Sequence, residues 1–116
     1  MNEFATNTFR TEKDSLGEVQ VPVDAWFGAQ TARAVANFPI SGRRPDKDFV
    51  LAHIRIKLAA AHANCQPGWL PEQKRDAIAA ACEKILAGEF DDQFVVDRFQ
   101  AGAGTSHNMN SNEVIA

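Results

Sequence analysis

The chain has 116 residues, of which 45% are hydrophobic and 23% charged, ordinary values for one modest globular domain. Its net charge of -3 and its pI of about 5.5 argue against a nucleic-acid-binding protein, because a phosphate partner favours a basic surface. No stretch approaches the roughly 20 apolar residues of a membrane span, and the polar first residues lack the apolar run of a signal peptide. We therefore expect a cytoplasmic protein without nucleic-acid or membrane partners, whose Cys65 and Cys82 are reduced thiols.

The first part of the chain predicts a short β segment followed by a helix. Residues 1–8 are expected to form a disordered N-terminus. Residues 9–22 alternate in character around Leu16-Gly17, which predicts small strands joined by a turn. Asp24 is a reasonable N-cap for a helix over 25–38, which Pro39 helps to end.

Apolar residues at helical spacing predict further helices. One covers 49–65, with Asp46 or Asp48 as its cap, and a second begins at Pro71 and ends near Gly88. After an irregular stretch, a last helix begins at Ser106 and reaches the end of the chain without a stop signal, so we expect a truncated chain. The predicted fold class is mainly α, with three to four helices and a small β-containing N-terminal segment.

The densest cluster of unusual residues lies in 99–113, which reads FQAGAGTSHNMNSNE. Gly102 and Gly104 permit tight backbone conformations, and Thr105 and Ser106 fall at the expected helix start, where backbone N–H groups lack intrahelical partners. Such a helix end can bind a carboxylate or a phosphate. The three asparagines that follow indicate a polar surface or site, because asparagine is unfavourable in a helix interior. The residues alone leave two interpretations open, a small-anion site and an ordinary capped turn.

Other polar residues give weaker signals. We interpret His53 and His62 as surface or packed histidines, because their spacing does not place them on one helix face. His107 lies beside the glycine loop and could contact a ligand, although a structural or solvated role is more common. Adjacent acidic residues such as Asp91-Asp92 usually cap a helix or face water. The sequence predicts no metal site and no catalytic triad.

The segment 99–113 also resembles the first signature region of the fumarase/aspartase superfamily of lyases. Residues 102–105, Gly-Ala-Gly-Thr, correspond to the family's Gly-Ser/Ala-Gly-Thr, and residues 108–113 correspond to its Asn-Met-Asn-x-Asn-Glu. Two upstream blocks, RTEKDSLG at 10–17 and WFGAQT at 26–31, match in order and at suitable spacing. The resemblance covers nearly all of residues 9–116, which are therefore expected to form the N-terminal lyase domain, truncated at the start of a central helical domain.

The resemblance implies a lyase that forms fumarate by reversible anti elimination from L-aspartate or L-malate, with no cofactor. It implies that Ala103, Gly104 and Thr105 contact a carboxylate of this small dicarboxylate substrate, with Asn108 as a further contact. The family's serine base and active-site histidine lie in later segments, so the catalytic residues of this chain are unknown and the fragment is expected to be inactive alone. The full-length parent is expected to be a homotetramer.

Two choices remain open within this prediction. Ala103 slightly favours the ammonia-lyase branch, since many fumarases have serine there, whereas residues 28–31, Gly-Ala-Gln-Thr, are typical of fumarases. The alternative from another class of function is a non-catalytic binding or assembly module derived from a lyase.

Overall fold

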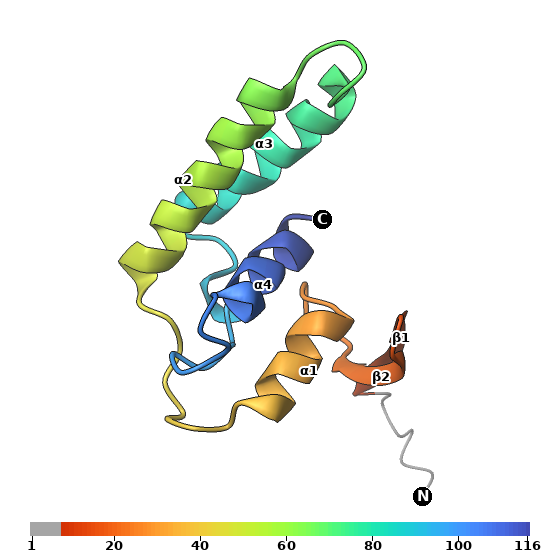
Figure 1. Cartoon of the computed structure of the whole chain (residues 1–116), viewed down its shortest axis with the longest axis vertical. Helices are drawn as coiled ribbons and strands as arrows, with labels where there is room; N and C mark the ends of the chain where they lie inside the picture. The colour runs from red at the N-terminus through yellow and green to blue at the C-terminus, as the bar shows by residue number, and fades with distance from the viewer. Residues whose placement is uncertain (1–7) are drawn as a thin grey trace, which may run out of the picture.

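The structure, a computed structural model, describes residues 8–116. The expected disordered N-terminus therefore lies outside the described residues, except for Thr8, whose carbonyl accepts a hydrogen bond from the Val23 amide at 3.0 Å. The elements in chain order are β1 (Phe9–Asp14), β2 (Gly17–Pro22), α1 (Ala29–Asn37), α2 (Lys47–Asn64), α3 (Glu72–Leu86), the 3-10 helix η1 (Asp91–Gln93) and α4 (Thr105–Ile115). Figure 1 shows α2 and α3 side by side as a long hairpin, with α4 between them and the α1 and β1–β2 end. The predicted mainly α fold with a small β segment is confirmed.

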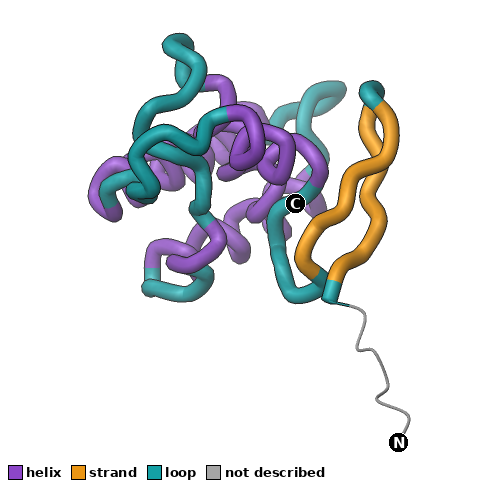
Figure 2. The backbone as a smooth tube through the Cα atoms, turned by 90° about the horizontal axis from the view of Figure 1, so that it is seen from below, coloured by secondary structure: helices purple, strands orange, loops and turns teal. Residues whose placement is uncertain are grey.

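The two strands form an antiparallel hairpin in which Asp14 lies opposite Gly17. Ser15 and Leu16 form its turn, and Gly17 has a φ of +114°, which favours glycine. Figure 2 shows the hairpin in orange along one side of the helices. Its inward face carries Val21, which is fully buried in the core, so the predicted strands and turn are confirmed.

Helix α1 begins at Ala29, and the prediction that Asp24 caps a helix from residue 25 is wrong. The reason is a side chain on β1. The Arg10 guanidinium donates hydrogen bonds to four backbone carbonyls, those of Pro22, Val23, Ala25 and Phe27, at distances of 2.7 to 3.2 Å. A guanidinium has five N–H donors, so Arg10 can bind several backbone carbonyls at once. These carbonyls are then unavailable for helical hydrogen bonds, and the helix begins later in the chain than predicted.

Helices α2 and α3 follow their local signals closely. The Asp46 side chain accepts a hydrogen bond from the Asp48 amide at 3.3 Å, so Asp46 is the cap of α2. Pro71 is the N-cap residue of α3, and Gly88, with a φ of +100°, follows its C-terminal end. The core between these helices, the hairpin and α4 is built from eight buried side chains: Val21, Phe27, Val50, Ile54, Cys82, Ile85, Phe94 and Val114. Burial raises the pKa of the Cys82 thiol, and both cysteines are free.

Candidate functional site

The glycine loop closes as a turn immediately before α4. The Gly104 amide donates to the Ala101 carbonyl at 2.9 Å, and Gly104, the N-cap residue, has a φ of +79°. This left-handed conformation explains the glycine at 104. Gly102 does not use it, and a Cβ atom at 102 would meet nothing within 4 Å. The backbone of the loop therefore faces open space on this side.

The first amides of α4 are open to an anion. The Gln100 side chain accepts from the His107 amide at 2.6 Å, whereas the Thr105 and Ser106 amides have no acceptor within residues 8–116. Gly104 has no side chain to cap the helix, and the first turn of α4 contains no acidic residue. The other three α-helices of the described chain each have a carboxylate at their start: Glu113 at α1, Asp46 at α2 and Glu72 at α3. The start of α4 thus keeps its partial positive charge uncompensated.

The residues expected to bind substrate lie together at this helix start. Ala103 and Thr105 are exposed, and Gly104 and Asn108 are half-buried. Thr105 and Asn108 are three positions apart on α4, which puts their side chains on one helix face. The Asn108 Oδ1 atom accepts a hydrogen bond from Lys57 Nζ at 2.6 Å, and the Asn108 side chain also lies near His53, whose Nε2 atom is buried. This face of α4 therefore offers backbone, hydroxyl and amide hydrogen-bond donors.

A cavity of about 270 Å³ adjoins Thr105 and Ser106. Arg33 and Asp14 also line it and bind each other through two hydrogen bonds of 2.8 and 2.9 Å. The hydrogen bond from Arg33 lowers the pKa of Asp14, so the pair is ionised and neutral overall. An anion here would therefore be attracted by the helix start rather than by an unpaired arginine.

His107 is buried away from the loop, which confirms the structural interpretation of this residue. Its side chain is 2% exposed, and its ring packs against those of Phe49 at 4.6 Å and His53 at 4.8 Å between centroids. Neither ring nitrogen has a hydrogen-bond partner among the described residues. Burial, with smaller contributions from His53 and Lys57, lowers the pKa of His107 to about 4. A neutral His107 thus joins α2 to α4.

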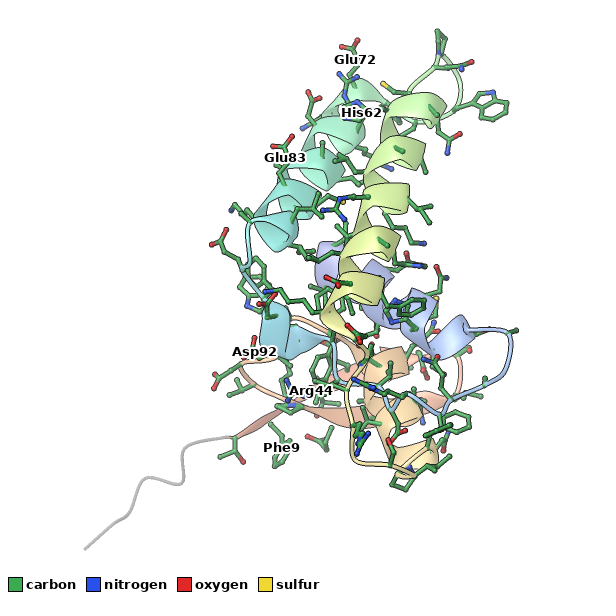
Figure 3. All side chains as sticks on the ribbon, turned by 90° about the vertical axis from the view of Figure 1, so that its left-hand side faces the viewer. Phe9, Arg44, His62, Glu72, Glu83 and Asp92 are labelled. Carbon is green, nitrogen blue, oxygen red and sulfur yellow. The ribbon has the colours of Figure 1, made fainter. Side chains whose placement is uncertain are left out.

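The remaining polar candidates lie on the surface. His62 is exposed in the last turn of α2, at the opposite end of the molecule from Asp92 and Arg44 (Figure 3). Asp91 forms an exposed ion pair with Lys47 at 3.1 Å. Within residues 8–116, no group of three or more histidine, cysteine or acidic side chains could hold a metal ion. No helix in this described range is long and apolar enough to cross a membrane.

The sequence analysis missed the structural roles of two polar residues on α4. Asn110 is fully buried, where its Oδ1 accepts from the Val95 amide at 3.0 Å and its Nδ2 donates to the Gln93 carbonyl at 2.9 Å. The expectation that all three asparagines mark a polar surface or site is therefore wrong for Asn110. Glu113 accepts hydrogen bonds from the start of α1 and so ties α4 to that helix.

Asp97 fixes the segment that leads into the loop. Its carboxylate accepts from the amides of Ser41, Gly42 and Phe99 and from the Ser41 hydroxyl, at 2.8 to 2.9 Å. These hydrogen bonds, that of the Phe99 amide above all, lower the pKa of Asp97 to about 2. A buried carboxylate in an irregular segment has no periodic signal in the sequence, which explains why it was overlooked.

Comparison with known proteins identifies the family. The family profile described as Lyase matches residues 17–116. The chain belongs to this lyase family. Class II fumarate hydratase of Halobacterium salinarum is 58% identical over 108 residues, which are 93% of this chain and 23% of that protein. Aspartate ammonia-lyase of Pseudomonas aeruginosa is 54% identical over 109 residues, 92% of this chain and 23% of that protein.

Solved structures agree with this assignment. The crystal structure described as fumarate lyase:delta crystallin from Brucella melitensis matches with a TM-score of 0.88 at 54% identity, covering 93% of this chain and 26% of that chain. The class II fumarase of Schistosoma mansoni matches with a TM-score of 0.87 at 38% identity, covering 92% of this chain and 23% of that chain. The resemblance to the fumarase/aspartase family is confirmed, and the lyase chain spans about a quarter of the length of these relatives.

Proposed function

We propose that this chain supplies a substrate-carboxylate site of a fumarate-forming lyase, built from Ala103, Gly104, Thr105 and Asn108. The observation that carries the proposal is the open start of α4, where two amides without acceptors adjoin the Thr105 hydroxyl. A carboxylate suits this position because it accepts several hydrogen bonds and compensates the helix dipole. L-aspartate, L-malate and fumarate all carry such a group.

The chemistry assigned to this site is stabilisation of negative charge. Removal of a proton beside a carboxylate places negative charge on that carboxylate, and fixed hydrogen-bond donors lower the energy of this state. The residues around the loop offer donors, whereas His107 is buried away from it. We propose, from the family resemblance, that the proton acceptor comes from other segments of the enzyme. We also propose that the enzyme acts as a homotetramer in the cytoplasm.

The leaving group is the finer part of the proposal. Ala103 slightly favours ammonia and hence L-aspartate, because a methyl group stands where many fumarases have a hydroxyl. The similarity to fumarate hydratases is at least as strong as that to aspartate ammonia-lyases, at 58% and 54% identity for the two relatives named above. Both substrates therefore belong in the test.

The chain alone is expected to form no fumarate from L-aspartate or L-malate, since the proposed proton acceptor lies in other segments of the enzyme. The ultraviolet absorbance of fumarate measures this in a purified sample. Turnover that co-purifies with the chain and is abolished by Thr105→Val would contradict the prediction and show a complete site.

A chimera tests whether the site can function. Residues of this chain would replace the matching 108 residues of the Halobacterium salinarum fumarate hydratase. We expect an active chimera in which Thr105→Val lowers kcat/KM for L-malate about 30-fold, the effect of one hydrogen bond to a charged group. Thr11→Val is the matched control, because Thr11 is exposed on β1, away from the loop.

The same exchange in the Pseudomonas aeruginosa aspartate ammonia-lyase tests L-aspartate. An assembled but inactive chimera in both enzymes would favour the non-catalytic module. Equal activity of the Thr105→Val and Thr11→Val proteins would exclude Thr105 from the substrate site.

A further inference from the structure

One charged hydrogen bond links α2 to the proposed substrate site on α4. Lys57 Nζ lies 2.6 Å from Asn108 Oδ1, and both side chains are partly buried. This distance is short for an N–H···O bond, as expected when the donor is an ammonium group. Asn108, one of the residues assigned to the substrate site, is thus bound by a side chain of α2.

The contact fixes which way the Asn108 amide points. An ammonium group can only donate, whereas the asparagine side chain has an acceptor end and a donor end. Turning the amide over would bring its NH₂ group against the NH₃⁺ group of Lys57, two donors face to face. The Asn108 Nδ2 group is therefore directed away from Lys57.

Two histidines lie near Lys57. His53 and His107 lie beside it, and burial followed by the charge of Lys57 lowers the pKa of His53. The pKa of His107 is lowered by burial, His53 and Lys57. Both imidazoles are thus neutral at pH 7, and Lys57 provides the charge of this cluster.

Lys57 does not line the loop cavity. The cavity beside Thr105 is not lined by Lys57, which instead borders a separate apolar cavity with Ala60 and Ala61. Asn108 does not line the loop cavity either, and its hydrogen bond with Lys57 is what links Lys57 to the residues proposed to bind substrate.

We propose that Lys57 is a positioning residue, which holds the Asn108 amide so that Nδ2 donates to the substrate carboxylate. The inference rests on the proposed function of the 103–105 loop and Asn108. The inference thus gives a residue of α2 a role in the lyase reaction, although α2 does not belong to the glycine loop or to α4.

The orientation can be measured in the chain itself by NMR of the Asn108 side-chain amide. In the wild type we expect both Hδ2 resonances to be displaced from the positions of a free asparagine, because the amide is bound to an ammonium group and held in one orientation. Lys57→Met should bring them toward the positions of a free asparagine, whereas Lys57→Arg, which keeps a charged donor, should retain most of the displacement. Lys47→Met is the matched control, because Lys47 lies on the same helix and pairs with Asp91 instead. The backbone amide spectrum of each variant verifies that it folds.

Titration with succinate, an unreactive dicarboxylate, tests the consequence for binding. We expect shifts at the Thr105 amide and at Asn108 Hδ2 in the wild type and in Lys47→Met. Lys57→Met should retain the Thr105 response, lose the Asn108 response and bind about fivefold more weakly, a fraction of the effect of a hydrogen bond to a charged group.

The outcomes separate the two proposals. An Asn108 amide that is the same in Lys57→Met as in the wild type would overturn the positioning role. An Asn108 amide that changes, in a protein whose Thr105 and Asn108 resonances ignore succinate before and after substitution, would instead overturn the carboxylate site. If Lys57→Met does not fold, Lys57→Gln and Lys57→Ala replace it. Loss of the wild-type Asn108 resonance positions in folded Lys57→Gln would support the inference. Full retention of these positions in Lys57→Gln, together with undiminished succinate binding by Lys57→Ala, would overturn it.

Discussion

Replacing Glu113 with alanine is expected to lower the free energy of unfolding by about 3 kcal/mol. The Glu113 carboxylate accepts hydrogen bonds from the amides of Gln30 at 3.2 Å and Thr31 at 2.7 Å, and from the Thr31 hydroxyl at 2.5 Å. It supplies the cap that Gly28 cannot, and it joins α4 to α1. Because Thr31 is fully buried, its hydroxyl would lose this acceptor without gaining water. Urea unfolding of the two proteins measures the difference.

Gly28 provides an independent test of the same cap. A Cβ atom at 28 would lie 2.5 Å from Glu113 Oε2, so an alanine would force the carboxylate off its amides. The φ of -118° at Gly28 is accessible to alanine, so backbone strain is not the cause. Gly28→Ala should therefore cost about 2 kcal/mol in the wild type and almost nothing when Glu113 is already alanine.

The control for this cycle is Glu83→Ala, which removes an exposed glutamate from α3 (Figure 3) and should leave the stability within about 0.5 kcal/mol of the wild type. Losses that add in the Gly28→Ala, Glu113→Ala double variant would show that the two positions do not interact. The proposed cap between α1 and α4 would then be wrong.

The elements that the sequence predicted well have signals within a few residues. The Leu16-Gly17 turn, the Asp46 cap and the glycine after α3 each depend on the chemistry of the turn or cap itself. The start of α1 was misplaced because it depends on Arg10, which binds carbonyls 12 to 17 positions further along the chain. Hydrophobic periodicity contains no information about such a contact.

The candidate site shows the same division. The glycine loop and Thr105 were recognisable from composition and from the family motif, since a helix start without a cap is a local feature. The residues that hold the site in place come from elsewhere: Lys57 is 51 positions from Asn108, and Glu113 is 82 positions from Thr31. A buried structural asparagine such as Asn110 is also indistinguishable from a ligand-binding one in a single sequence, because both are polar residues in a helix.

Acidification from pH 7 to pH 4.5 is expected to destabilise the chain by about 2 to 3 kcal/mol through His107. Burial lowers the pKa of this imidazole from its ordinary value of 6.5 to about 4. Between these two values the unfolded chain binds more protons than the folded chain, so stability falls as the pH falls. The contribution is complete above pH 6.5 and lost below about pH 4. Urea unfolding at several pH values measures this slope.

His107→Leu separates this effect from other acid-sensitive groups. Leucine fills a similar volume between Phe49 and His53, and it removes two ring nitrogens that have no partner within the described chain. The variant should be at least as stable as the wild type at pH 7 and should lose most of the slope between pH 6.5 and 4.5. His62→Leu, at an exposed position on α2, should keep the slope. Asp14 and Asp97, whose pKa values are lowered from 3.8, act at lower pH, so a slope that survives in His107→Leu would place the acid sensitivity at another group, with His53 the first to test.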